Sequence, residues 1–143
     1  MFTIKRTYEF SAAHRVEGHP KCGRLHGHNY VVTVEVAGPL DDNEMVIDFA
    51  DLDKIVKPIV EEVDHRYMVS GANIDADDPY FKHGKAADCV IMEGLWQTTA
   101  ECLAAWFAER IDGDPNLPDS INCYSITVQE TGKNYATWHA KPA

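Results

Sequence analysis

Three histidines are spaced so that their imidazoles can meet on one face of the folded chain. His26 and His28 are separated by a single glycine. In a β-strand such residues point to the same side, because side chains alternate with a period of two. His14 falls in phase with Phe10 and Ala12, on the apolar face of the preceding segment. Three neutral imidazoles suit zinc and leave a fourth position for water or substrate.

The alternative to a metal site is that the three histidines are ordinary core residues. A single histidine on an apolar face is more often a hydrogen-bonded core residue than a ligand. Three of them on inward faces favour a metal, and Cys22 lies four residues before His26. If Cys22 were a fourth ligand, the site would be closed and structural. If it were not, the site would be open and catalytic, and the spacing alone leaves both possible.

Two strands and a helix must position these residues. Residues 2–14 alternate as a half-buried strand, with Arg6 as the polar exception on the apolar face, and a second strand covers about 27–37. Residues 48–63 have the period of a helix with Asp48 as its N-cap, and Pro58 should kink or divide it. The apolar stripe of this helix is Phe49, Leu52, Ile55, Val56, Ile59, Val60 and Val63.

The second half of the chain is less regular. Residues 69–97 read as an extended loop region in which Cys89 to Met92 can add a short strand. Thr98 and Glu101 form a capping-box pattern before a second helix, whose buried face is expected at Leu103, Ala104, Phe107 and Ile111. Strands follow at 121–130, with Tyr124, Ile126, Val128 and Glu130 on one face, and at 135–139. We therefore predict one α+β domain over residues 1–143 with an antiparallel sheet.

Composition limits the partners. The net charge is −10, from 13 basic and 23 acidic side chains, and a field of that sign repels nucleic acid and anionic membranes. The 4 cysteines include no C-x-x-C pair, and no apolar leader or membrane-length run is present. We expect a cytoplasmic protein that binds a small molecule.

Five short motifs carry a resemblance to a known family: Phe10-Ser-Ala-Ala-His14, Lys21-Cys22-Gly23-Arg24-Leu25-His26-Gly27-His28, Val46-Ile47-Asp48-Phe49, Asp64-His65 and Gln129-Glu130-Thr131. Together they resemble the 6-pyruvoyltetrahydropterin synthase family over most of the chain, except about 69–97 and the last few residues. The Cys-x-x-x-His-x-His spacing is similar to the bacterial 6-carboxy-5,6,7,8-tetrahydropterin synthase branch.

The resemblance implies a fold, an assembly and a reaction. The fold would be the tunnelling fold, with two helices on one face of an antiparallel sheet and subunits joined into a barrel. A homo-oligomer, usually a hexamer, would place active sites between subunits. Zinc would bind His14, His26 and His28. The substrate would be 7,8-dihydroneopterin triphosphate, converted to 6-carboxy-5,6,7,8-tetrahydropterin with release of acetaldehyde and triphosphate, for queuosine and other deazapurine pathways.

Roles for individual residues follow from the same resemblance. Cys22 would be the proton-abstracting base, and Asp64 with His65 would relay a proton toward it, either within one subunit or across a subunit boundary. Without the resemblance, Asp64 and His65 would be a polar helix terminus. Glu130 would accept two N–H groups of the pterin, rather than simply reach solvent at a strand end. Thr98 and Thr99 would serve pterin binding, helix capping, or one each. Independently of the resemblance, Lys21, Arg24 and Arg15 are candidates for triphosphate contacts, although for any one of them solvation at the surface is the commoner role.

The chain also departs from the family pattern at three places. Glu44 stands where glycine is frequent, Met68-Val69 where Leu-Asn is common, and Gln97-Thr98 where Pro-Thr is common.

Three rival functions compete with the carboxy synthase: a 6-pyruvoyltetrahydropterin synthase, a non-catalytic zinc-binding protein, and a cysteine hydrolase using Cys22 and His65. The last leaves the three histidines unexplained.

Overall fold

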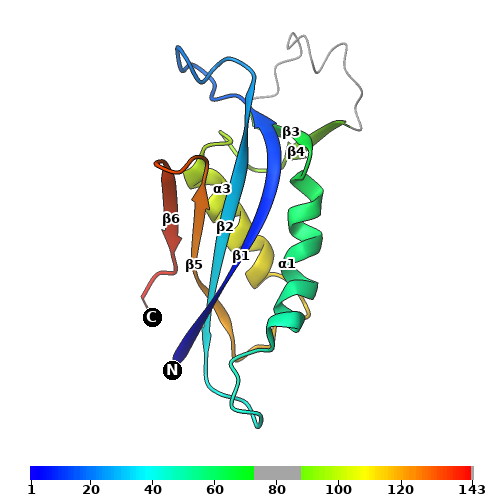
Figure 1. Cartoon of the computed structure of the whole chain (residues 1–143), viewed down its shortest axis with the longest axis vertical. Coiled ribbons are helices and arrows are strands. Elements are labelled where there is room, and N and C mark those ends of the chain that lie inside the picture. The colour runs from blue at the N-terminus through cyan, green and yellow to red at the C-terminus, as the bar shows by residue number, and fades with distance from the viewer. Residues whose placement is uncertain (73–87, 143) are drawn as a thin grey trace.

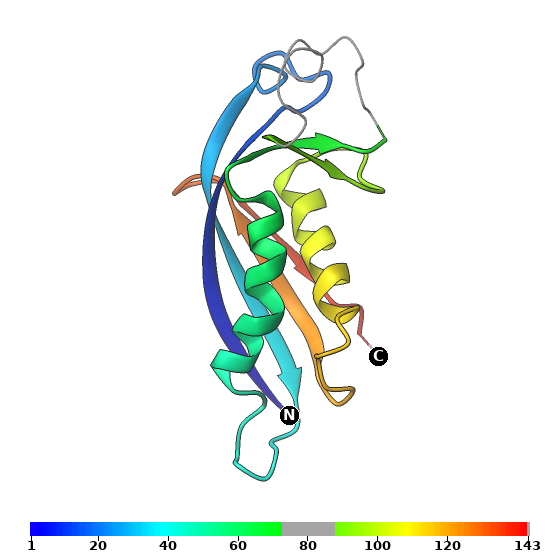
Figure 2. The ribbon, with the colours of Figure 1, turned by 90° about the vertical axis from the view of Figure 1, so that its right-hand side faces the viewer.

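A curved sheet carries two helices on one face in the computed structural model, which describes residues 1–72 and 88–142 (Figures 1 and 2). The elements in chain order are β1 (Phe2–His14), β2 (His26–Gly38), α1 (Phe49–Val63), β3 (Arg66–Ser70), β4 (Cys89–Met92), α3 (Ala100–Asp112), β5 (Asn122–Gln129) and β6 (Tyr135–His139). The strand order in the sheet is β4-β3-β1-β2-β5-β6. The core lies between the sheet and the helices, as the predicted two-layer α+β architecture requires.

The β1–β2 hairpin is the longest feature of the sheet and sets its register. The two strands pair antiparallel from Phe2 opposite Gly38 to His14 opposite His26. Their inward residues alternate as predicted, with Tyr8 and Phe10 buried on β1 and Tyr30 buried on β2. The hairpin therefore delivers its histidines to one end of the sheet, on the face that the helices cover.

The sheet is mixed, so the prediction of an antiparallel sheet is wrong in one region. β3 pairs parallel with β1, and β4 pairs parallel with β3. The short strand at Cys89 to Met92 is confirmed, whereas β3 was not expected and extends into the predicted loop region at 69–70. Residues 73–87 of that predicted loop lie outside the described residues.

Helix α1 begins where the sequence predicts. The Asp48 carboxylate accepts a hydrogen bond from the Ala50 amide as the N-cap, and Pro58 lies inside one undivided helix. The predicted stripe is buried except at Phe49, which is 46% exposed and lies under the Arg6 guanidinium. No helix among the described residues is both long and apolar enough to cross a membrane.

Arg6 is inward-facing because α1 offers it a partner. Its guanidinium donates two hydrogen bonds to the Asp53 carboxylate, at 2.6 and 3.0 Å, and the Tyr8 hydroxyl donates a third at 2.8 Å. These contacts hold the pKa of Asp53 below its ordinary value, although partial desolvation acts in the opposite direction. The polar exception in the β1 pattern is thus an ion pair between β1 and α1.

Two local predictions in the second half need correction. The N-cap of α3 is Thr99, whose hydroxyl accepts from the Cys102 amide, so the expected box of Thr98 with Glu101 does not form. The buried face of α3 is as predicted. In β5, an irregular register pairs Glu35 with Ser125 and Val36 with Cys123. The extra residue, Tyr124, is 47% exposed and leaves the predicted buried face because a bulge reverses the alternation.

Candidate metal centre and active site

The β1–β2 register brings the three imidazoles together. His14 lies directly opposite His26, while His28 lies opposite Ala12, one inward position further along β2. One ligand atom from each ring lies within 4.8 Å of the other two. The ring centroids are 4.7 Å apart for His14 and His26, 5.1 Å for His14 and His28, and 4.9 Å for His26 and His28. These three side chains can hold a metal ion.

Backbone carbonyls fix the orientation of two of the rings. The Nδ1 of His14 lies 2.8 Å from the Thr98 carbonyl oxygen, and the Nδ1 of His26 lies 2.6 Å from the Arg24 carbonyl oxygen. A carbonyl oxygen only accepts, so each Nδ1 carries the hydrogen and each Nε2 keeps its lone pair. This is the outer-shell arrangement that orients metal-binding histidines.

Burial favours the neutral form of His14 and of His28. His14 is 1% exposed, and desolvation lowers its pKa to about 4. Desolvation also lowers the pKa of His28, although Glu130 acts in the opposite direction. The Nε2 atoms of His14 and His28 and the hydroxyl of Tyr30 are buried without a hydrogen-bond partner among the described residues. Unpartnered acceptors are costly to bury, so a cation bound between the rings fits this donor set.

Cys22 lies in the loop between β1 and β2 and does not belong to the three-histidine group. Its side chain is partly exposed. Its backbone is held on both sides: the Val16 amide donates to the Cys22 carbonyl at 2.8 Å, and the Cys22 amide donates to His19 Nδ1 at 2.8 Å. Thus the arrangement favours the open, three-ligand interpretation of the site over the closed one.

Glu130 follows β5 and faces the histidines. One of its carboxylate oxygens lies 3.9 Å from His28 Nε2. The residue also lines a hollow of about 390 Å³ between the N-terminal end of α3 and the turn that joins β5 to β6. Thr99, Lys133 and Tyr135 line the same hollow. A carboxylate and a hydroxyl beside the three-histidine group are suited to binding a polar ring.

The two threonines have different surroundings. Thr98 is 1% exposed; its hydroxyl donates to the Arg15 carbonyl at 3.2 Å, and its own carbonyl orients His14. Thr99 caps α3 and lines the hollow beside Glu130. Thr98 therefore supports the histidine group, and Thr99 is the threonine that a bound molecule could reach.

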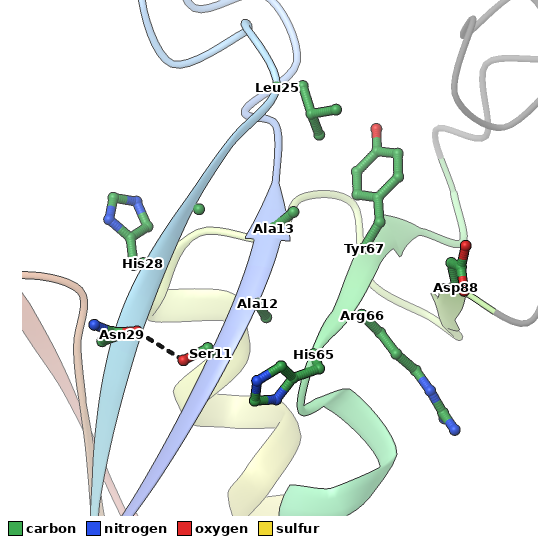
Figure 3. Close-up of a pocket in the computed structure, with 11 residues that line it drawn as sticks. Ser11, Ala12, Ala13, Leu25, His28, Asn29, His65, Arg66, Tyr67 and Asp88 are labelled. Atoms are coloured by element: carbon green, nitrogen blue, oxygen red, sulfur yellow. Dashed lines mark hydrogen bonds between the residues drawn. The ribbon is translucent and has the colours of Figure 1, made fainter. Parts of the chain in front are cut away.

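Asp64 and His65 follow α1 and do not belong to the three-histidine group; the His65 amide donates to the Ser11 carbonyl at 2.6 Å, and Figure 3 shows the His65 ring beside Ser11. The Asp64 carboxylate accepts from the Ser11 amide at 3.0 Å and contacts His65 Nδ1 at 2.8 Å, and the Ser11 amide is the main reason that the pKa of Asp64 is low. His65 has a left-handed backbone, with φ of 58°, and its side chain is 80% exposed. The dyad is thus preformed and accessible.

His65 lines a second hollow, of about 520 Å³, together with Leu25, Asn29 and Tyr67 (Figure 3). His28 also lines this hollow, so that one ring belongs both to the three-histidine group and to the hollow beside His65. In the described part of the chain, no hydrogen bond joins Cys22 to His65. Cys22 and His65, which the family resemblance assigns to one reaction, are thus not bonded to each other within the described part of one chain.

Sequence reasoning missed two supporting residues and only partly placed the basic ones. His19 accepts hydrogen bonds from the amides of Cys22 and Lys21, and Gln97 contacts the backbone of Glu17. No local pattern marks either contact. Arg15 donates to the Gly23 carbonyl at 2.7 Å, so it is part of the loop, while Lys21 and Arg24 are exposed.

The sequence is similar to one family and to several curated proteins. The family described as 6-pyruvoyl tetrahydropterin synthase matches residues 3–141. A putative 6-carboxy-5,6,7,8-tetrahydropterin synthase of Pyrococcus horikoshii is 35% identical, over 94% of this chain and 90% of its own. The 6-carboxy-5,6,7,8-tetrahydropterin synthase of Haemophilus influenzae is 31% identical, over 96% and 99%. A putative 6-pyruvoyl tetrahydrobiopterin synthase of Caenorhabditis elegans is also 31% identical, over 95% and 93%.

Solved structures share the fold. The 6-pyruvoyl tetrahydropterin synthase of Plasmodium vivax superposes with a TM-score of 0.77 at 21% identity, covering 99% of this chain and 100% of that one. The Caenorhabditis elegans 6-pyruvoyl tetrahydropterin synthase gives a TM-score of 0.68 at 29% identity, covering 98% and 96%.

Proposed function

The chain belongs to the 6-pyruvoyl tetrahydropterin synthase family, and on that premise we propose that it is a zinc-dependent 6-carboxy-5,6,7,8-tetrahydropterin synthase. The reaction converts 7,8-dihydroneopterin triphosphate to 6-carboxy-5,6,7,8-tetrahydropterin, with release of acetaldehyde and triphosphate. The convergence of His14, His26 and His28 beside Glu130 is the observation that carries the proposal. The names of the relatives from Haemophilus influenzae and Pyrococcus horikoshii favour the carboxy product over the pyruvoyl one.

Zinc is the cation that the three rings suit best. Each offers a neutral nitrogen, two rings are oriented through Nδ1, and two buried Nε2 atoms have no partner among the described residues. When bound, zinc would act as a Lewis acid toward oxygens of the substrate side chain and favour loss of the adjacent proton. Three protein ligands leave room for that contact.

Glu130 would anchor the pterin in the hollow of about 390 Å³. A carboxylate can accept two parallel N–H groups of a pterin as a bidentate pair. Thr99 lines the same hollow and could contribute its hydroxyl. Held in this way, the ring would direct the C6 side chain toward the histidines, because Glu130 already lies 3.9 Å from His28.

Cys22 would remove the proton, and Asp64 with His65 would carry protons to and from it. Within one chain, among the described residues, the dyad is outside the three-histidine group and makes no hydrogen bond to Cys22. We therefore include in the proposal that a second copy supplies the dyad, in a homo-oligomer of hexameric type with active sites between subunits. The exposed His65 side chain and the hollow beside it are available to such a neighbour. A cytoplasmic location and a role in queuosine synthesis accompany the proposal.

The proposal is tested by incubating the zinc-loaded protein with 7,8-dihydroneopterin triphosphate. The expected products are 6-carboxytetrahydropterin by mass spectrometry and an equimolar amount of acetaldehyde in a coupled assay. A pyruvoyl product without acetaldehyde would identify the pyruvoyl synthase instead. Absence of any turnover would refute both enzyme functions.

Two variants separate the enzyme from the remaining rivals. Cys22→Ala should retain zinc and lose activity, whereas loss of zinc would identify Cys22 as a ligand of a structural site. Chelation should abolish activity in the wild type, and zinc should restore it. Activity that survives chelation would favour a cysteine hydrolase.

A further inference from the structure

The segment that leads into α3 contacts both the metal centre and the loop that carries Cys22. The Thr98 carbonyl accepts from Nδ1 of His14 at 2.8 Å. The Thr98 hydroxyl donates to the Arg15 carbonyl at 3.2 Å. Beside it, the Gln97 carboxamide makes two hydrogen bonds to Glu17. Residues 97–98 are therefore joined to residues 14–17 across about 80 positions of sequence.

The Gln97 contact resembles a backbone pairing. Its Oε1 accepts from the Glu17 amide at 2.9 Å, and its Nε2 donates to the Glu17 carbonyl at 3.1 Å. Two bonds from one planar group fix orientation as well as distance, as bidentate pairs do. Both bonds come from the side chain of residue 97, so a substitution at that position removes the tether without altering the backbone of Glu17.

The restraint reaches Cys22 through short connections. Val16, next to Glu17, donates its amide to the Cys22 carbonyl at 2.8 Å. Arg15 holds the Gly23 carbonyl at 2.7 Å. Gly23 also packs so closely that a β-carbon there would lie 2.5 Å from the His19 carbonyl oxygen. Because these contacts hold the loop between Glu17 and Cys22, a displacement of Glu17 would also displace Cys22.

From these contacts we infer that Gln97 is a positioning residue that sets the place of Cys22 relative to the three histidines. Gln97 acts on the loop, and Thr98 beside it acts on His14, so one short segment fixes both halves of the site. The role of Gln97 in turnover rests on the proposed function. Its role as a tether can be measured without substrate.

The test compares Gln97→Ala with Gln97→Glu in full-length, zinc-loaded protein. The alanine variant loses both bonds, and we expect hydrogen exchange of the amides in residues 15–25 to be about tenfold faster. The glutamate variant keeps an acceptor for the Glu17 amide and should show an intermediate increase. Zinc content should stay unchanged in both. The kcat of the alanine variant should fall about tenfold with KM within about twofold, because Cys22 is misplaced but the pterin pocket is intact.

Exchange elsewhere in the chain provides the control. In the alanine variant, exchange in α3 and along β1 should match the wild type. Unchanged exchange in residues 15–25, or an equal increase throughout the molecule, would overturn the inference. If the wild type fails to turn over the pterin triphosphate, the proposed function fails, while the exchange measurement still decides whether Gln97 tethers the loop.

Discussion

At the scale of single residues, the geometry of the three-histidine group depends on the hydrogen bonds that orient the rings as well as on the rings themselves. The Thr98 and Arg24 carbonyls fix which nitrogens of His14 and His26 face the shared space. His28 has different surroundings, because its Nε2 lies 3.9 Å from a carboxylate oxygen of Glu130. Each ring therefore contributes differently to metal binding and to stability, and these differences can be measured.

His28→Ala should weaken zinc binding by more than about 100-fold, since removal of a ligand exceeds the loss seen when an outer-shell partner is removed. Competition with a chelator measures the affinity, and metal analysis after dialysis gives the content. His139→Ala on β6 is the matched control, because that histidine is exposed and lies outside the three-histidine group. Equal zinc affinity in both variants would show that the metal lies elsewhere.

Burial of His14 should make the metal-free protein sensitive to acid. The pKa of His14 is about 4 in the fold, against an ordinary value of 6.5. The unfolded chain therefore binds the proton first as pH falls, and the fold loses stability from about pH 6.5 down to about 4. The loss attributable to this group is at most about 3 kcal/mol. Denaturant titrations at several pH values measure it.

The control for that experiment is His14→Gln, which cannot titrate in this range. Its free energy of unfolding should depend less steeply on pH than that of the wild type between those limits. Parallel pH profiles for the two proteins would mean that the His14 ring is not held neutral by burial.

At the scale of elements, the turn before α1 contains a strained residue. Glu44 has φ of 60°, in the left-handed region that favours glycine. The turn is closed by the Asp41 carboxylate, which accepts from the amides of Asn43 and Met45 at 2.8 and 3.0 Å. These bonds hold the backbone in place even though the side chain at 44 disfavours it.

Glu44→Gly should therefore stabilise the protein by about 0.5–1 kcal/mol, since the strain removed exceeds the added freedom of the unfolded chain. Thermal and denaturant unfolding measure the change. Glu44→Ala removes the same charge but keeps the β-carbon, so it should give no comparable gain. If alanine stabilised the fold as much as glycine, charge rather than backbone strain would be the cause.

At the scale of the whole molecule, no hydrogen bond joins Cys22 to His65 within the described part of one chain. The sheet ends in two edge strands, β4 and β6, and the hollow beside His65 is open to a neighbouring molecule because the His65 side chain is 80% exposed. Edge strands with unpaired backbone groups are natural places for a second copy to pair. On the proposed function, we therefore expect the active site to be completed by assembly with a second copy.

Mixing two inactive variants tests that assembly. Cys22→Ala and His65→Ala should each lose activity, and subunits exchanged between them should regain it in up to about a quarter of the sites formed at random. Light scattering on each variant checks that both assemble like the wild type. Absence of any recovery after demonstrated exchange would place Cys22 and His65 in one subunit's site.

Local periodicity was enough to predict much of this molecule. Alternation placed His14, His26 and His28 on inward faces, and helical spacing with Asp48 as cap located α1. Charge and cysteine usage suggested a small-molecule protein. These features depend on residues that are close together in the chain, so they can be inferred from the sequence. The family motifs added expected roles for Cys22 and Glu130.

Contacts between distant segments decided the rest. The parallel pairing of β3 and β4, the bulge that exposes Tyr124, and the bonds from residues 97–98 to residues 14–17 all depend on which elements meet. No local pattern specifies such a meeting, because hydrogen-bond partners across tens of residues are chosen by the packing of the whole sheet. The sequence by itself therefore determined that the three histidines face inward, and only the tertiary structure decided what holds them in place and where the alternation is interrupted.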